Sequence, residues 1–222
     1  MQKLKRLAEA EVIAEFLKNE FHHPEFHADR ELFENLVFQP DLNDERQNAL
    51  RRELLCRRYA DLWRELPSET QWWEVRIEPA DLDLIRVAPR REWKRIANGS
   101  MLLKDVAGRI RSGRFSGKSV CKVQAIGYNL RQKVDHSSVL LIGIGEGKPL
   151  TIVDGNHRLA AALQTGDAAA AGQFRGIAGF SPRMSECYCY DGATINRWRR
   201  FTGWMKELAV EEHAGWVEKS AA

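Results

Sequence analysis

The sequence predicts an α+β fold in which a mixed sheet is flanked by helical segments. Three observations predict it. Alternating apolar residues at 72–77 are typical of a half-buried strand. Two apolar runs, at 139–144 and 150–153, are separated by a turn and lead directly into an alanine-rich segment of helical composition. Apolar stripes at helical spacing occupy both ends of the chain.

Composition and charge narrow the possible classes. The chain has 222 residues, of which 44% are hydrophobic and 29% charged, as expected of a globular protein. Its formal net charge of +3 permits a nucleic-acid partner without requiring one. The apolar runs are shorter than the roughly 20 residues that cross a membrane. Glu9, Glu11 and Glu15 lie where a signal peptide is apolar, and 4 cysteines are too few for a disulfide framework. We therefore expect a cytoplasmic protein without a membrane partner.

Residues 1–70 are predicted to form an N-terminal helical segment. An amphipathic stripe predicts a first helix over residues 3–18. Asn43 or Asp44 is the expected N-cap of a second helix that runs to about Leu66, where Pro67 follows.

Residues 71–180 are predicted to form the sheet-containing core, and residues 181–222 a helical tail. After the strand at 72–77, the pattern predicts a helix from Ser100 and a loop at 112–119. The remaining predicted elements are a strand at 119–128, the strand pair 139–144 and 150–153, a helix at 156–164, a strand at 174–180 and a helix at 194–216.

The most informative pattern is Asp154-Gly155-Asn156-His157-Arg158, which stands between a predicted strand and a predicted helix. A helix N-terminus exposes unpaired N–H groups that favour a bound phosphate. Gly155 permits a sharp turn and close approach of a ligand. Arg158 supplies a planar fork suited to phosphate oxygens, and His157 a neutral or cationic donor. Asp154 is placed to hold a magnesium ion or to accept a proton.

A purely structural interpretation of the same residues is that Asp154 caps the helix and Arg158 pairs with it. The clustering of Asn156, His157 and Arg158 directly after a strand favours the anion site instead. The anion-site hypothesis requires an open cavity in front of these groups.

This pattern resembles that of the ParB/sulfiredoxin superfamily, over about residues 73–180. In that family a strand, a glycine turn and a helix N-terminus form the nucleotide-phosphate site. Gly155, His157 and Arg158 match the Gly-x-His-Arg of sulfiredoxin, while Asp154 matches the Asp-Gly-Gln-His-Arg members and the free-serine-kinase-like members. Asn156 replaces the reactive cysteine of sulfiredoxin and the glutamate of partition proteins, which argues against sulfinic-acid repair and against a CTP switch.

The resemblance implies a nucleotide-binding phosphoryl-transfer enzyme, either an ATPase or a small-molecule kinase, that uses ATP or another nucleoside triphosphate with Mg²⁺. It implies catalytic roles for Asp154, His157 and Arg158, phosphate contacts from Gly155, Asn156, His157 and Arg158, and Asp154 as the metal ligand. The alternatives are a ParB-like DNA-binding regulator, defence protein or nuclease with a nucleotide switch, and a degenerate member that only binds a partner.

Two further motifs look like sites but lack part of the required pattern. Residues 112–119 resemble a P-loop, but Ser112 stands where the motif needs glycine and a helix-like stretch precedes it. A basic flexible loop is therefore expected there. Cys187 and Cys189 form a lone C-x-C pair, which is interpreted as two ordinary strand cysteines.

His22, His23 and His27, together with Glu25, form a candidate metal cluster, although Pro24 interrupts the spacing of a single helical face. A polar connecting segment is the favoured interpretation.

Basic residues gather in three places, at 51–58, 86–95 and 197–200. Such clusters are typical of a solvated face, but together with aromatic side chains they can follow a nucleic-acid backbone. The 7 tryptophans are expected in the core rather than on base-stacking surfaces. Glu92 and Glu146 are candidate general bases if either faces Arg158.

Overall fold

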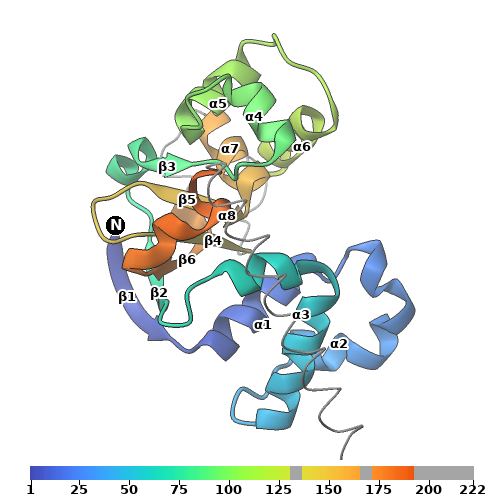
Figure 1. The fold of residues 1–222 in the computed structure, drawn as a ribbon. Helices are drawn as coiled ribbons and strands as arrows, with labels where there is room; N and C mark the ends of the chain where they lie inside the picture. The colour runs from blue at the N-terminus through green and yellow to red at the C-terminus, as the bar shows by residue number, and fades with distance from the viewer. Residues whose placement is uncertain (131–136, 166–171, 193–222) are drawn as a thin grey trace, which may run out of the picture.

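Figure 1 shows the computed structural model of the chain, which describes residues 1–130, 137–165 and 172–192. Its centre is a six-stranded sheet with the order β1-β2-β6-β4-β5-β3. The strands are β1 (Gln2–Leu7), β2 (Gln71–Arg76), β3 (Ile85–Arg86), β4 (Ser138–Gly143), β5 (Leu150–Asp154) and β6 (Arg175–Phe180). The β3/β5 and β4/β6 pairs are parallel, and the other three pairs are antiparallel. The fold is therefore α+β with a mixed sheet, as the sequence predicts.

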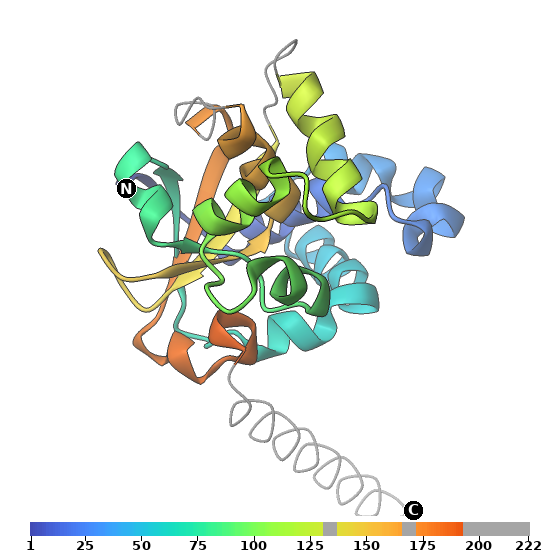
Figure 2. The same cartoon turned by 90° about the horizontal axis from the view of Figure 1, so that it is seen from above.

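Helices cover both faces of the sheet (Figures 1 and 2). One face carries α4 (Arg91–Ala97), α5 (Leu103–Arg111), α6 (Lys118–Leu130) and α7 (Asn156–Gln164). The other carries α1 (Glu9–Glu20), α2 (Arg30–Phe38) and α3 (Glu45–Glu65), with the short α8 (Tyr188–Asp191) beside β5 and α3. The 3-10 helices η1 (Pro24–Asp29), η2 (Pro79–Asp83) and η4 (Pro182–Glu186) complete the connections.

The hydrophobic core lies in two layers, one on each side of the sheet. β4 is buried at every residue, and its side chains alternate between the layers: Leu141 packs on the side of α5 and α7, whereas Leu140 and Ile142 pack on the side of α1. A strand that is covered on both faces has a continuous apolar sequence. The strand predictions for β4 and β5, which were based on such runs, are therefore confirmed.

Two helix predictions are also confirmed. α7 spans Asn156–Gln164, the predicted range. α3 begins after Asp44, whose Oδ1 accepts hydrogen bonds from the N–H groups of Arg46 and Gln47. These bonds satisfy two of the unpaired donors at the helix N-terminus, as a good N-cap does.

The predicted helix over residues 3–18 is wrong for its first turn. Residues Gln2–Leu7 form the edge strand β1, which pairs antiparallel with β2, and the helix begins only at Glu9. Basic side chains on an edge strand hinder a further strand from pairing with it. The charges that suggest the exposed face of a helix are therefore equally suited to an edge strand. The segment 1–70 is therefore helical only after β1.

The predicted strand at 119–128 is wrong as well, because these residues lie within α6. The buried positions 120, 123, 127 and 130 are three or four residues apart, which is helical spacing. Cys187 and Cys189 are not strand residues either: Cys187 precedes α8 and Cys189 lies within it. The predicted helix at 194–216 and the basic cluster at 197–200 lie outside the described residues.

None of the helices in the described parts of the chain combines the length and the apolar character that a membrane span requires.

Candidate functional site

The N-terminus of α7 is built by a glycine that no other residue can replace without strain. Gly155 is the N-cap and has a left-handed backbone with φ of 97°. A Cβ atom at this position would lie 2.6 Å from Val139 Cγ1. The turn therefore needs glycine both for its conformation and for its close packing on β4.

The backbone amides at this N-terminus are available to a ligand. In the described part of the chain no side chain caps α7, and its first backbone bond joins the Leu159 N–H to the Gly155 carbonyl at 3.0 Å. The N–H groups of residues 156–158 thus precede the hydrogen-bonded ladder of the helix. They can bind an anion at the positive end of the helix dipole.

A cavity of about 370 Å³ opens in front of these amides. Its walls come from α1, α3, α6, the segment before α4 and the β5–α7 turn. Among the described residues, four lysine and arginine side chains line it: Arg58, Arg90, Lys122 and Arg158. The open space that the sequence hypothesis requires is therefore present, and its lining is rich in cations that suit a phosphate.

Asp154 and Arg158 form an ion pair at the floor of the cavity. Arg158 Nη2 lies 2.6 Å from Asp154 Oδ2, and the two side chains are only 15% and 14% exposed. Asn19 Nδ2, from α1, donates to the same oxygen at 2.9 Å. Part of the structural interpretation is thus realised, although Gly155 rather than Asp154 is the N-cap. No donor from the described residues reaches Asp154 Oδ1, which leaves that oxygen for a ligand.

His157 is a neutral group in this environment. Its Nε2 lies 3.0 Å from Ser119 Oγ, and its ring packs against the edge of Trp93 with centroids 5.0 Å apart. Burial, together with the nearby Lys122 and Arg90, lowers the pKa of His157 to about 4. Of the two forms that the sequence allows, the structure therefore favours the uncharged imidazole at neutral pH.

Asn156 does not offer its side chain to an anion. The side chain is buried, and its Oδ1 accepts a hydrogen bond from the N–H of Ala88. Only the backbone amide of Asn156 contributes to the anion site. The side chain instead ties the start of α7 to the segment that carries Arg90.

Glu20, at the end of α1, is a site residue that the sequence did not indicate. Its Oε2 lies 3.1 Å from His23 Nε2, and both residues line the cavity with Asp154. Burial, and next the negative charge of Asp154, raise the pKa of Glu20 to about 7. Burial and the charge of Arg58 lower the pKa of His23 to about 4. The sequence signal that could have indicated Glu20 is its acidic side chain in the last turn of a helix, where the helix dipole disfavours a negative charge.

Neither candidate general base from the sequence reaches the site. Glu146 pairs with Lys3 of β1 at 2.6 Å, and Glu92 is an exposed residue of α4. Neither side chain lines the cavity.

The candidate metal cluster at residues 22–27 is not formed, since Glu25 pairs with Arg58. Across the described ranges, no three His, Cys, Asp or Glu side chains gather as a metal site would require. His22 and His23 line the cavity instead.

The site must be interpreted from its own geometry. Comparisons of the chain with models of known protein families, with curated proteins and with solved structures find no match. The geometry offers backbone donors, a cationic lining and two carboxylates, from Glu20 and Asp154, in one cavity. This combination can hold a charged phosphate group and exchange a proton beside it.

Proposed function

We propose that the protein is a nucleotide-binding phosphoryl-transfer enzyme, an ATPase or a small-molecule kinase, with a ParB/sulfiredoxin-like core. One observation carries the proposal: the N-terminus of α7, which no described side chain caps, opens into a cavity lined by arginine and lysine side chains. Phosphoryl transfer depends mainly on positioning and on charge stabilisation, and these are what such a site supplies.

The phosphate contacts follow from the position of each group. The N–H groups of residues 156–158 bind phosphate oxygens along the helix axis. Arg158 donates through Nη2 to Asp154, its one hydrogen-bond acceptor among the described residues. The other nitrogens of the guanidinium can therefore bind a phosphate. Arg90 and Lys122 add positive charge from two other elements, and neutral His157 offers a hydrogen bond.

The residues present fit a magnesium ion that arrives with the nucleotide. Mg²⁺ is typically held by one or two carboxylates together with substrate phosphates rather than by a complete protein cage. Asp154 has an oxygen that no described side chain occupies, and it lines the cavity beside the amides that would hold the phosphates. When bound, the ion would neutralise negative charge on the phosphates.

Glu20 is the general base in this proposal. Its pKa of about 7 lets it accept a proton near neutral pH from a water molecule or an acceptor hydroxyl. His23, which lies within hydrogen-bond reach of Glu20, is mostly uncharged at that pH and orients the carboxylate. Asp154 is engaged by Asn19 and Arg158, which suits it to binding rather than to proton transfer.

The test is nucleotide binding by Arg158→Ala. Wild-type protein should show a raised melting temperature with ATP, ADP, CTP or GTP in the presence of magnesium, because a ligand that binds only the native state stabilises it. Arg158→Ala should keep its fold and lose both this stabilisation and any turnover. Arg91→Ala, at an exposed position outside the cavity, is the matched control. Equal turnover in Arg158→Ala would refute the proposal. Salt-dependent retention on DNA without nucleotide binding would favour the DNA-binding alternative instead.

A further inference from the structure

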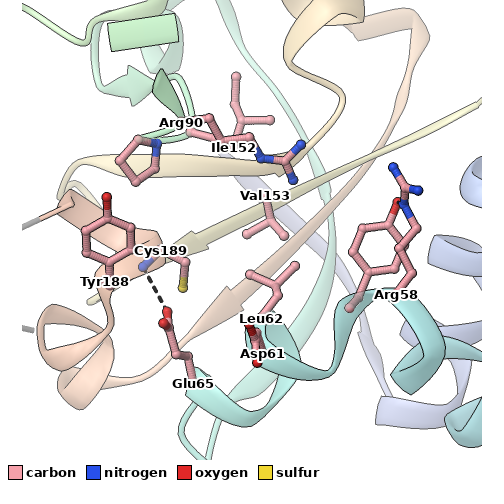
Figure 3. A pocket seen from close by; sticks show the side chains of 12 residues that line it. Arg58, Asp61, Leu62, Glu65, Arg90, Ile152, Val153, Tyr188 and Cys189 are labelled. Atoms are coloured by element: carbon pink, nitrogen blue, oxygen red, sulfur yellow. Dashed lines mark hydrogen bonds between the residues drawn. The ribbon is translucent and has the colours of Figure 1, made fainter. Parts of the chain in front are cut away.

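A second cavity, of about 250 Å³, lies between α3, the segment before α4, β5 and α8 (Figure 3). Two of its walls, α3 and α8, lie outside the predicted core at residues 71–180, and the other two belong to that core. Nothing in the phosphate chemistry described above uses this space.

The two cavities share a wall. Arg58, Tyr59, Arg90 and Val153 line both of them. Val153 also directly precedes Asp154 in β5. In Figure 3 the guanidinium of Arg90 lies beside Val153, on the side toward Arg58. The two cavities are therefore neighbours, with Arg90 between the α7 site and the second cavity.

The lining of the second cavity suits a flat ring rather than another phosphate. Leu62, Pro89 and Ile152 supply apolar surface, and Tyr188 supplies an aromatic face. Lys94 Nζ lies over the Tyr188 ring, 5.4 Å from its centroid, and this cation–π contact helps to hold the ring in place. Apolar and aromatic side chains of this kind bind planar heterocycles by stacking and desolvation.

The acidic groups at this cavity also favour a heterocyclic base over a phosphate. Asp61 and Glu65 line it, and the Cys189 N–H donates to Glu65 Oε2 at 3.0 Å, which fixes that carboxylate at the wall (Figure 3). Ionised carboxylates accept hydrogen bonds from ring amino groups and repel phosphate oxygens. Arg58 and Arg90 also line this cavity, but they belong to the wall that it shares with the first. The acidic and apolar side chains therefore gather in the part next to α8.

We propose that this second cavity binds the nucleobase of the nucleotide whose phosphates lie at the N-terminus of α7. The inference rests on the proposed function, since it takes the phosphate position from it. It adds that α3 and α8 give the site a preference for a nucleotide over an inorganic polyphosphate.

Calorimetric titration of the full chain with Mg-ATP and with magnesium tripolyphosphate tests the inference. Wild-type protein should bind Mg-ATP about tenfold or more tightly, because only ATP has a base to stack. Leu62→Trp, which fills the cavity from α3, should reduce this ratio to about one while the tripolyphosphate affinity stays within about twofold. Tyr188→Ala, which removes the aromatic face from α8, should reduce the ratio in the same way.

The outcomes separate the two proposals. Arg158→Ala should weaken both ligands, since both use the phosphate site. Equal wild-type affinity for the two ligands, or an ATP preference that survives in both cavity variants, would overturn the nucleobase assignment and leave the phosphate site standing. Absence of binding by either ligand would overturn the proposed function and the nucleobase site with it.

Discussion

The Oδ1 atom of Asn156 accepts a hydrogen bond of 2.8 Å from the backbone N–H of Ala88. The bond is buried and joins the first residue of α7 to the segment that leads into α4. Two residues after Ala88, Arg90 lines both cavities. The same side chain therefore fixes the amides of α7 and the position of an arginine relative to one another.

Asn156→Ala should destabilise the protein and weaken nucleotide binding. It leaves the buried Ala88 N–H without an acceptor, at a cost on the order of 1–3 kcal/mol in the free energy of unfolding. Asn156→Asp keeps an acceptor but adds a negative charge at the phosphate site. Its free energy of unfolding should therefore fall less than that of Asn156→Ala, while its affinity for nucleotide should still fall. Urea unfolding and ATP titration measure the two effects. Asn129→Ala, at an exposed position of α6, is the control, and a loss no larger than that control's would contradict the role of Asn156.

Gly155→Ala should be among the more damaging glycine substitutions in the chain. It combines a positive φ with a contact of 2.6 Å to Val139 Cγ1, so strain and overpacking together should cost about 2–4 kcal/mol. Gly113→Ala has a φ of 70° and no atom within 4 Å, and should show only the smaller conformational cost, about 1 kcal/mol. Thermal or urea unfolding compares them. Similar losses in the two variants would show that packing on Val139 is unimportant.

Local signals explain most of what the sequence predicts correctly. Three features were predictable because each depends on residues close in sequence. They are the glycine turn before α7, the aspartate that caps α3, and the continuous apolar runs of β4 and β5. The five residues at 154–158 all line the cavity because one turn positions all of them. Their side-chain roles were less predictable, since Asn156 turns toward Ala88 and His157 toward Ser119.

The rest of the site depends on contacts between distant segments. Asn19 meets Asp154 across 135 positions of sequence, and Glu20 enters the cavity only because α1 packs against β4. The helix prediction for residues 3–7 is wrong for the same reason, since the partner strand β2 lies about 70 residues away.

Arg51 shows the converse error, because a residue assigned to a solvated basic face is fully buried. Its guanidinium donates to the carbonyl oxygens of Leu36 and Asp41. Periodicity along α3 carries no information about the carbonyl groups at the end of α2, so this structural role was not visible in the sequence.

Glu20→Gln should change how stability depends on pH. The pKa of Glu20 is about 7 in the folded protein and about 4.5 when unfolded, so the folded state binds more protons between these values. Ionisation of Glu20 therefore destabilises the native state as pH rises through this window. Since glutamine does not titrate, the variant should gain on the order of 2 kcal/mol relative to wild type between pH 5 and pH 8.

Urea unfolding at the two pH values measures this effect, with Glu31→Gln at an exposed site of α2 as the control. The variant should also bind nucleotide while losing turnover, as expected for a general base. A stability difference that is independent of pH would show that Glu20 is not held in a perturbed environment.

The four cysteines should separate by their rates of alkylation. Cys56 and Cys121 are exposed, whereas Cys187 is buried and its Sγ donates to the Glu65 carbonyl at 2.9 Å. A hydrogen bond with Cys187, together with burial, raises the pKa of Cys189 well above its usual value. Because the thiolate is the reacting form, Cys189 should react slowly at neutral pH even though it lines the second cavity.

A short pulse of iodoacetamide followed by peptide mass spectrometry should find Cys56 and Cys121 modified first. Cys187 and Cys189 should follow only in urea, where the pair is separated and the thiols are exposed. Cys187→Ser provides the sharper comparison, because it replaces the thiol neighbour of Cys189 by a hydroxyl while leaving the exposed cysteines unchanged. Labelling of Cys189 as fast as Cys56 in the folded wild-type protein would contradict both the raised pKa of this thiol and its burial.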